Sequence, residues 1–142
     1  MEIVSFEIAQ KLKEKGFYYK CFATYDKDGM LGYNYVQPEK NCAIGFDDCL
    51  CANNIENNGC IDAPTISQVL KWLREEKNIH INIDFYSDKI SDNEYTYWSY
   101  RIIDMNNGKI IYKFDNKQCM LEFESYEEVA ITGVEYVLDN LI

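Results

Sequence analysis

Apolar residues recur every three or four positions in three stretches of the chain, which is the period of an amphipathic helix. The first stretch covers residues 5–15. Ser5 is suited to its N-cap, and Gly16 is suited to a left-handed C-terminal cap. The last stretch covers residues 126–140 and follows Ser125, which begins an S-x-x-E capping box. Both stretches are therefore predicted to be helices.

The middle stretch lies in the most regular part of the chain, DAPTISQVLKWLREEKNIHI. Thr65 precedes Gln68 with the T-x-x-Q spacing of a second capping box. Four apolar residues at helical spacing predict a stripe that faces the core: Ile66, Val69, Leu70 and Leu73. Trp72 lies on the flank of this stripe, so we predict that its side chain is half buried.

Strict alternation of apolar and polar residues, the pattern of a half-buried strand, begins at residue 79. Residues 79–85 are predicted to form a strand, 87–94 a turn region, and 95–105 a second strand. An Asn-Gly pair then predicts a hairpin into a third strand, over 109–115. Residues 119–123 are predicted to add a short edge strand. Strands joined by short turns imply an antiparallel sheet.

Residues 18–61 are harder to assign, because Asn, Asp and Gly make much of this segment loop-like. A strand is predicted within 18–25 and a return strand within 30–36, joined by a turn at DKDG. The remainder is predicted to be a long, irregular surface segment. Residues 1–142 are thus predicted to form a single α+β domain, in which an antiparallel sheet of three or more strands carries helices on one face, as a two-layer sandwich.

Composition adds that the domain is folded and acidic. Hydrophobic residues make up 47% of the 142 residues, and the net charge is −10. This charge disfavours nucleic acid and an anionic membrane surface as partners, but it permits a basic protein partner. There is no basic-then-apolar leader and no apolar run of about 18 residues. We therefore predict a cytoplasmic protein with no nucleic-acid or membrane partner, whose six cysteines are reduced thiols.

Four of the cysteines lie close together in the irregular segment: Cys42, Cys49, Cys51 and Cys60. Four thiolates can close a structural zinc site, and zinc stabilisation of this segment is one interpretation. The usual zinc pattern contains C-x2-C pairs, however, and none is present here. We therefore interpret these residues as small buried hydrophobes or surface thiols, and we predict no metal and no cofactor.

Motifs for catalysis are not recognisable. The single histidine, His80, lies on the strand face opposite Ile79 and Ile81, without a Ser or Cys nucleophile in a recognisable setting. No phosphate loop, dinucleotide fingerprint or nucleophile elbow occurs. Acidic pairs such as Glu75-Glu76 are interpreted as solvated helix faces. We therefore predict that the protein is not an enzyme.

The segment EYTYWSY is rich in aromatic residues that suit a binding surface. Alternation places Tyr95 and Tyr97 on one face of the strand and Trp98 and Tyr100 on the other. If helices cover only one face, two large rings are exposed, and Tyr and Trp are frequent anchors in binding sites. Alternatively, the tyrosines lie on a solvent-exposed face of the sheet without a binding role, or the 18–61 segment covers them.

The segment APTISQVLKWLREEKNIHI (63–81) resembles the central motif of a family of small uncharacterised proteins from gut bacteria and their phages or mobile elements. The matching pattern is Ala-Pro-Thr-x-Ser-x-x-x-Lys-Trp-Leu-Arg-Glu. LKEKGF (12–17) and FESYEEVAITGVEYVLDNLI (123–142) are similar to the first and closing helices of that family. The resemblance implies an accessory protein of a bacterium or its phage that acts by binding, and it implies no particular activity.

Two functions stay open after these arguments. The first is a small acidic, non-enzymatic module that binds a protein partner through the exposed sheet face or segment 18–61. The second is a small-molecule binder or unrecognised enzyme with a pocket near Trp72 and His80. These two residues join the aromatic strand residues as candidate binding residues, because neither has a structural assignment.

Overall fold

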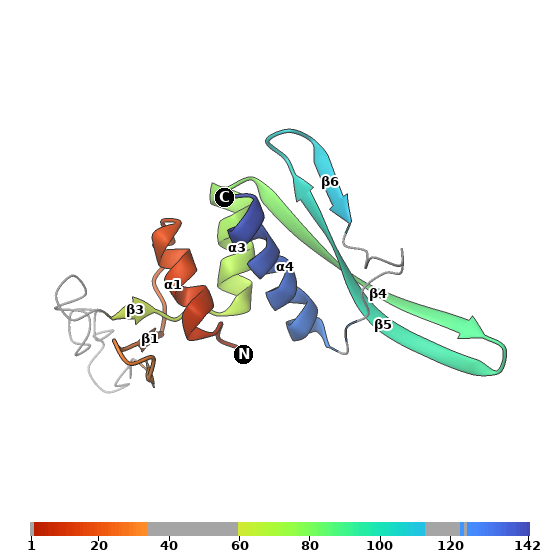
Figure 1. Ribbon diagram of the computed structural model, residues 1–142, viewed down its shortest axis with the longest axis horizontal. Helices are drawn as coiled ribbons and strands as arrows, with labels where there is room; N and C mark the ends of the chain where they lie inside the picture. The colour runs from red at the N-terminus through yellow and green to blue at the C-terminus, as the bar shows by residue number, and fades with distance from the viewer. Residues whose placement is uncertain (1, 34–59, 113–122, 124) are drawn as a thin grey trace, which may run out of the picture. The chain divides into compact units, whose positions relative to one another are not determined.

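The computed structural model describes residues 2–33, 60–112, 123 and 125–142 (Figure 1). In the described residues the elements are α1 (Phe6–Glu14), β1 (Ala23–Tyr25), β2 (Leu31–Tyr33), β3 (Ile61–Asp62), α3 (Ile66–Glu76), β4 (Ile79–Ile90), β5 (Asn93–Asp104), β6 (Lys109–Tyr112) and α4 (Tyr126–Asn140). The fold is α+β, as predicted, with two antiparallel sheets. The chain divides into two compact units, Met1–Thr65 and Ile66–Ile142, and the single-domain prediction stays a prediction.

Helix α1 of the first unit begins and ends where the capping residues predict. The hydroxyl oxygen of Ser5 accepts a hydrogen bond from the Ile8 amide at 3.4 Å. Gly16 has a φ of +83°, a left-handed conformation that residues with a Cβ rarely adopt. Ile8, Ala9 and Leu12 form the buried stripe of the helix, so capping and periodicity together define this element.

A small antiparallel sheet, ordered β2-β1-β3, completes the first unit. β1 and β2 pair from Ala23 opposite Tyr33 to Tyr25 opposite Leu31, which confirms the hairpin predicted on either side of DKDG. The Tyr25 hydroxyl donates a hydrogen bond to the Val4 carbonyl oxygen at 2.6 Å and ties the sheet to the N-terminal segment.

The second unit is built on a sheet ordered β4-β5-β6. β4 and β5 each have 12 residues and pair along their whole length, so residues 87–90 and 93–94 belong to the hairpin strands and not to a turn region. Cross-strand contacts explain the difference, because Ser87 Oγ donates a hydrogen bond to Glu94 Oε1 at 2.9 Å. Such pairing outweighs the weak strand propensity of the polar residues there. The hairpin predicted at Asn-Gly is confirmed by β5 and β6.

Helix α3 presents a slightly different stripe from the predicted one. Its buried residues are Ile66, Val69, Trp72 and Leu73, whereas Leu70 is only half buried. Trp72 is 0% exposed, so the prediction that it is half buried was wrong. Because an indole ring removes more apolar area from water than a leucine side chain does, the helix is turned toward Trp72.

Helix α4 spans the predicted residues and packs on one face of the sheet. Ser125 caps it by accepting a hydrogen bond from the Glu128 amide at 3.1 Å. At Gly133 a Cβ would lie 3.1 Å from Ile81 Cγ2 of β4 and 3.6 Å from the Tyr100 ring of β5. Glycine thus allows the close approach of helix to sheet that makes this unit a two-layer structure.

Some predictions fall on parts of the chain outside the described residues. These are the end of the 30–36 strand, the third strand beyond Tyr112, most of the 119–123 edge strand, and three of the clustered cysteines: Cys42, Cys49 and Cys51. Phe123 itself forms an antiparallel bridge with Trp98. None of the helices in the described part of the chain is long and apolar enough to cross a membrane.

Candidate functional site

The aromatic residues predicted from EYTYWSY alternate between the two faces of β5. Tyr100 lies under α4 and is 2% exposed. Trp98 lies on the same face and is half buried, and Tyr97 is half buried on the opposite face. Tyr95 pairs with Asp88 in the register of the hairpin, and its side chain is outside the described part of the structure. The helix-covered face is therefore that of Trp98 and Tyr100, which the sequence did not decide.

Aromatic side chains gather on the β4–β5 hairpin and at the first residue of α4. The hairpin itself extends past the helices of its unit (Figure 1). We call this group the aromatic band, and its members are Phe85, Tyr86, Tyr97, Trp98 and Tyr126. On the helix side, the Trp98 ring lies 4.9 Å from that of Phe85 and 5.7 Å from that of Tyr126, between ring centroids. On the other side, the Tyr86 and Tyr97 rings are stacked at 5.5 Å.

The band contains apolar surface that water can reach. Phe85 is 54% exposed and Tyr86 is 37% exposed, and these two residues are consecutive, so their rings lie on opposite faces of the hairpin. Each ring is supported by a directly opposite ring on β5, Trp98 for Phe85 and Tyr97 for Tyr86. The band therefore offers an aromatic surface on both sides of one projecting element.

The face of the sheet away from the helices also carries a polar group. Arg101 Nε lies 3.0 Å from Asp84 Oδ2, and Asn82 Nδ2 donates a hydrogen bond to Asp84 Oδ1 at 2.9 Å. His80 is half buried on the same face, opposite Ile103 in the sheet register. The Asp84 carboxylate is thus already paired, and this arrangement resembles a structural ion pair more than an acid–base site.

Trp72 lies in the core and not on the surface. The Nζ atom of Lys77 lies 5.0 Å from the centroid of its ring, within the range of a cation–π contact. Complete burial gives this tryptophan the structural role that the sequence left unassigned, and it removes the ring from the accessible surface. Of the predicted candidates, Tyr97 and Trp98 lie together in the aromatic band, and Trp72, His80 and Tyr100 lie outside it.

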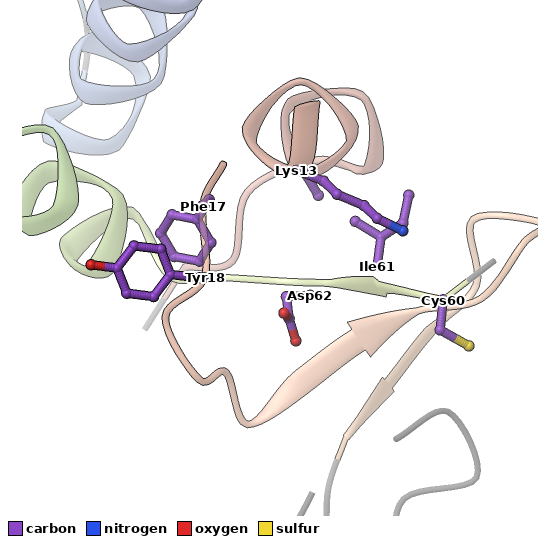
Figure 2. A pocket seen from close by; sticks show the side chains of 7 residues that line it. Lys13, Phe17, Tyr18, Cys60, Ile61 and Asp62 are labelled. Carbon is purple, nitrogen blue, oxygen red and sulfur yellow. The ribbon is translucent and has the colours of Figure 1, made fainter. Parts of the chain in front are cut away.

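A cavity of about 280 Å³ lies in the first unit, and neither Trp72 nor His80 lines it (Figure 2). It is lined by Ala9, Lys13, Phe17, Tyr18, Cys60, Ile61 and Asp62. Figure 2 shows the Phe17 and Tyr18 rings together at one end and Cys60 at the other, with residues of α1 and β3 between them. The cavity thus combines aromatic walls with one acidic and one basic side chain.

Asp62 is the unusual group of this cavity. Its side chain is half buried, and its carboxylate forms no hydrogen bond or salt bridge with another residue in the described ranges. Burial raises the pKa of this carboxyl above its ordinary value of 3.8, and the nearby Lys13 lowers it in part. A desolvated carboxylate without a direct partner is a recognised mark of a binding site.

The two cysteines that the structure describes have different states. Cys21 is a free, buried thiol, and burial together with Asp62 raises its pKa to about 12, so it is unreactive at neutral pH. Cys60 is disulfide-bonded, so the prediction of six reduced thiols was wrong for this residue. The cysteine pattern alone could not show this, because a disulfide depends on which sulfur atoms meet in space.

Sequence reasoning missed several residues of both sites. Phe85, Tyr86 and Tyr126 join the aromatic band only through the sheet register and the position of α4, although the YWSY alternation pointed to their partners. The cavity residues come from segments far apart in sequence, and no local motif marks them. Within the described ranges, no group of three His, Cys, Asp or Glu side chains is arranged to hold a metal ion.

Comparisons with known proteins add no relationship to these observations. No protein-family model matches the chain, and no curated protein and no solved structure matches it. The resemblance to the family of small gut-bacterial and phage proteins therefore stays a prediction.

Proposed function

We propose that the chain is a small acidic, non-enzymatic module that binds a protein partner through the aromatic band. The observation that carries the proposal is the exposure of Phe85 and Tyr86 on opposite faces of one hairpin. Aromatic anchors dominate the binding energy of many protein interfaces. Because Tyr97 and Trp98 support these rings, little side-chain freedom is lost when a partner docks on them.

The chemistry of the partner follows from charge. A net charge of −10 supports a partner with a basic surface and argues against nucleic acid. Lysine and arginine side chains of such a partner would also stack on the tyrosine and tryptophan rings of the band. In line with the family resemblance, we assign the module to a bacterium or its phage as an accessory protein.

The proposal is tested by replacing the exposed rings without removing the strand. A partner captured from bacterial lysate is identified, purified and titrated against the wild type and a Phe85→Thr/Tyr86→Thr variant. Threonine retains strand propensity. The variant is expected to bind at least about 30-fold more weakly, because the loss of a single hot-spot residue already costs roughly 2 kcal/mol of binding free energy.

Ile110→Thr is the matched control, since Ile110 is also an exposed hydrophobic residue of the same sheet but lies outside the band. It is expected to bind like the wild type. Equal affinities for all three proteins, or no partner that binds directly, would contradict the proposal. Circular dichroism melting of each variant separates loss of binding from loss of folding.

The same proposal places the module in the cytoplasm. The Cys60 disulfide is evidence against this location, because disulfides persist mainly in oxidising compartments. Alkylation of the denatured protein from its native host, followed by mass spectrometry, decides between the two. Alkylation of Cys60 without prior reduction supports the cytoplasm. A Cys60 that is alkylated only after reduction places the protein in an oxidising compartment.

A further inference from the structure

The cavity of the first unit has features that the aromatic band does not explain. A half-buried aspartate, a lysine and two aromatic residues line it, and it is open to solvent on one side (Figure 2). We propose that this cavity binds a small zwitterion, of which a free amino acid with an aromatic or apolar side chain is the simplest. The proposal concerns the first unit alone and does not depend on the proposed protein-binding function.

Asp62 is suited to the ammonium group of such a ligand. Its carboxylate lines the cavity and is partly removed from water, without a hydrogen bond or salt bridge to any residue within the described ranges. A ligand ammonium group would donate charge-assisted hydrogen bonds to it and repay the desolvation that now raises the pKa of the carboxyl. A cationic ligand group therefore stabilises Asp62 in its charged form.

Lys13 is suited to the carboxylate of the same ligand. It projects from α1 at the same cavity and lowers the pKa of Asp62, yet no salt bridge joins the two side chains. A simple amine would be attracted by Asp62 and repelled by Lys13, whereas a zwitterion satisfies both charges. Selectivity for molecules that carry both groups follows from this pair.

Size and apolar walls limit the remainder of the ligand. The volume of about 280 Å³ lies below the roughly 300–1,000 Å³ of sites for drug-sized molecules, so a compact ligand fits best. Phe17 is buried and Tyr18 is 65% exposed, so the two rings form a wall that reaches from the interior to the entrance. An aromatic or branched apolar side chain would pack against this wall.

The test uses three probes that share one ring and differ only in charge. These are phenylalanine, phenethylamine and 3-phenylpropanoate, each titrated at millimolar concentrations into the full chain under NMR observation. Phenylalanine is expected to shift the amide signals of Lys13, Phe17 and Asp62. The other two probes are expected to bind about tenfold more weakly or worse, since each lacks one charge-assisted contact.

Charge-neutral variants locate the site. Asp62→Asn and Lys13→Gln are each expected to weaken phenylalanine binding by about tenfold or more. Asp28→Asn and Lys27→Gln are the matched controls, because both residues are exposed at the β1–β2 turn outside the cavity, and they are expected to change nothing. Equal binding of the three probes, equal effects of cavity and control variants, or the absence of any shift with phenylalanine would overturn the proposal. Failure here leaves the test of the aromatic band unaffected, because that band lies in the other unit.

Discussion

At the scale of single residues, the ring of Tyr100 stabilises the fold, whereas burial of its hydroxyl group costs free energy. Its ring fills the space between β5 and α4 beside Phe123, at 6.0 Å between centroids. Its hydroxyl group is buried and has no hydrogen-bond partner among the residues that the structure describes. Burial, with a smaller contribution from Tyr136, raises its pKa from 10.0 to about 12. The ring therefore stabilises the fold while the hydroxyl group makes it sensitive to alkaline pH.

We expect the free energy of unfolding to fall as the pH rises from 10 to about 12. In this window the unfolded chain has released the Tyr100 proton and the folded chain still holds it. Deprotonation therefore favours unfolding, by on the order of 3 kcal/mol in total. Below pH 10 this contribution is fully present. Urea denaturation at a series of pH values measures it. Tyr100→Phe is expected to reduce the loss of stability between pH 10 and about 12. Tyr126→Phe changes an exposed tyrosine and is expected to lose stability as the wild type does. If the stability of all three proteins falls in parallel with pH, Tyr100 is not the responsible group.

At the scale of elements, local signals predicted most of the fold. The caps at Ser5 and Ser125 and the periodicity of α4 placed two helices almost to the residue. Two errors came from tertiary packing. A period of 3.6 residues cannot choose between a stripe flanked by Leu70 and one flanked by Trp72, because both fit it. Likewise, the polar end of the β4–β5 hairpin forms strand because of its cross-strand partners, which a propensity for turns does not take into account.

The close packing of α4 on the sheet leads to a prediction at this scale. Gly133→Leu places a side chain where even a Cβ would lie 3.1 Å from Ile81 Cγ2, and β-branched Ile81 has little freedom to move away. We expect a loss of stability of about 1–3 kcal/mol or more, from overpacking. Glu135→Leu makes a leucine on the exposed side of the same helix and is expected to change stability by about 0.5 kcal/mol or less. Thermal or urea unfolding compares the two, and equal effects would show that α4 does not pack closely at Gly133.

At the scale of the whole molecule, the candidate sites were less predictable than the fold. The alternation of Tyr97 and Trp98 was visible in the sequence, because a strand has a fixed period of two. Their partners Phe85 and Tyr86 depended on the register of the hairpin, which the assumed turn region at 87–94 concealed. The cavity depends on the meeting of α1 with β3, which are separated by most of the first unit. Sites of this kind follow from tertiary structure, and no local pattern marks them.

The division into two units predicts that residues 66–142 fold without the first unit. They contain a three-stranded sheet, two helices and a shared core that includes Leu73, Ile81, Ile102, Val134 and Leu138. Domains of about 60 residues already bury enough surface to fold alone, so this fragment is long enough. We expect it to unfold cooperatively and to give dispersed NMR amide signals at the positions found in the full chain. A domain that lacks part of its core loses cooperative unfolding. A fragment that melts without cooperativity would therefore show that both units share one core, as the single-domain prediction requires.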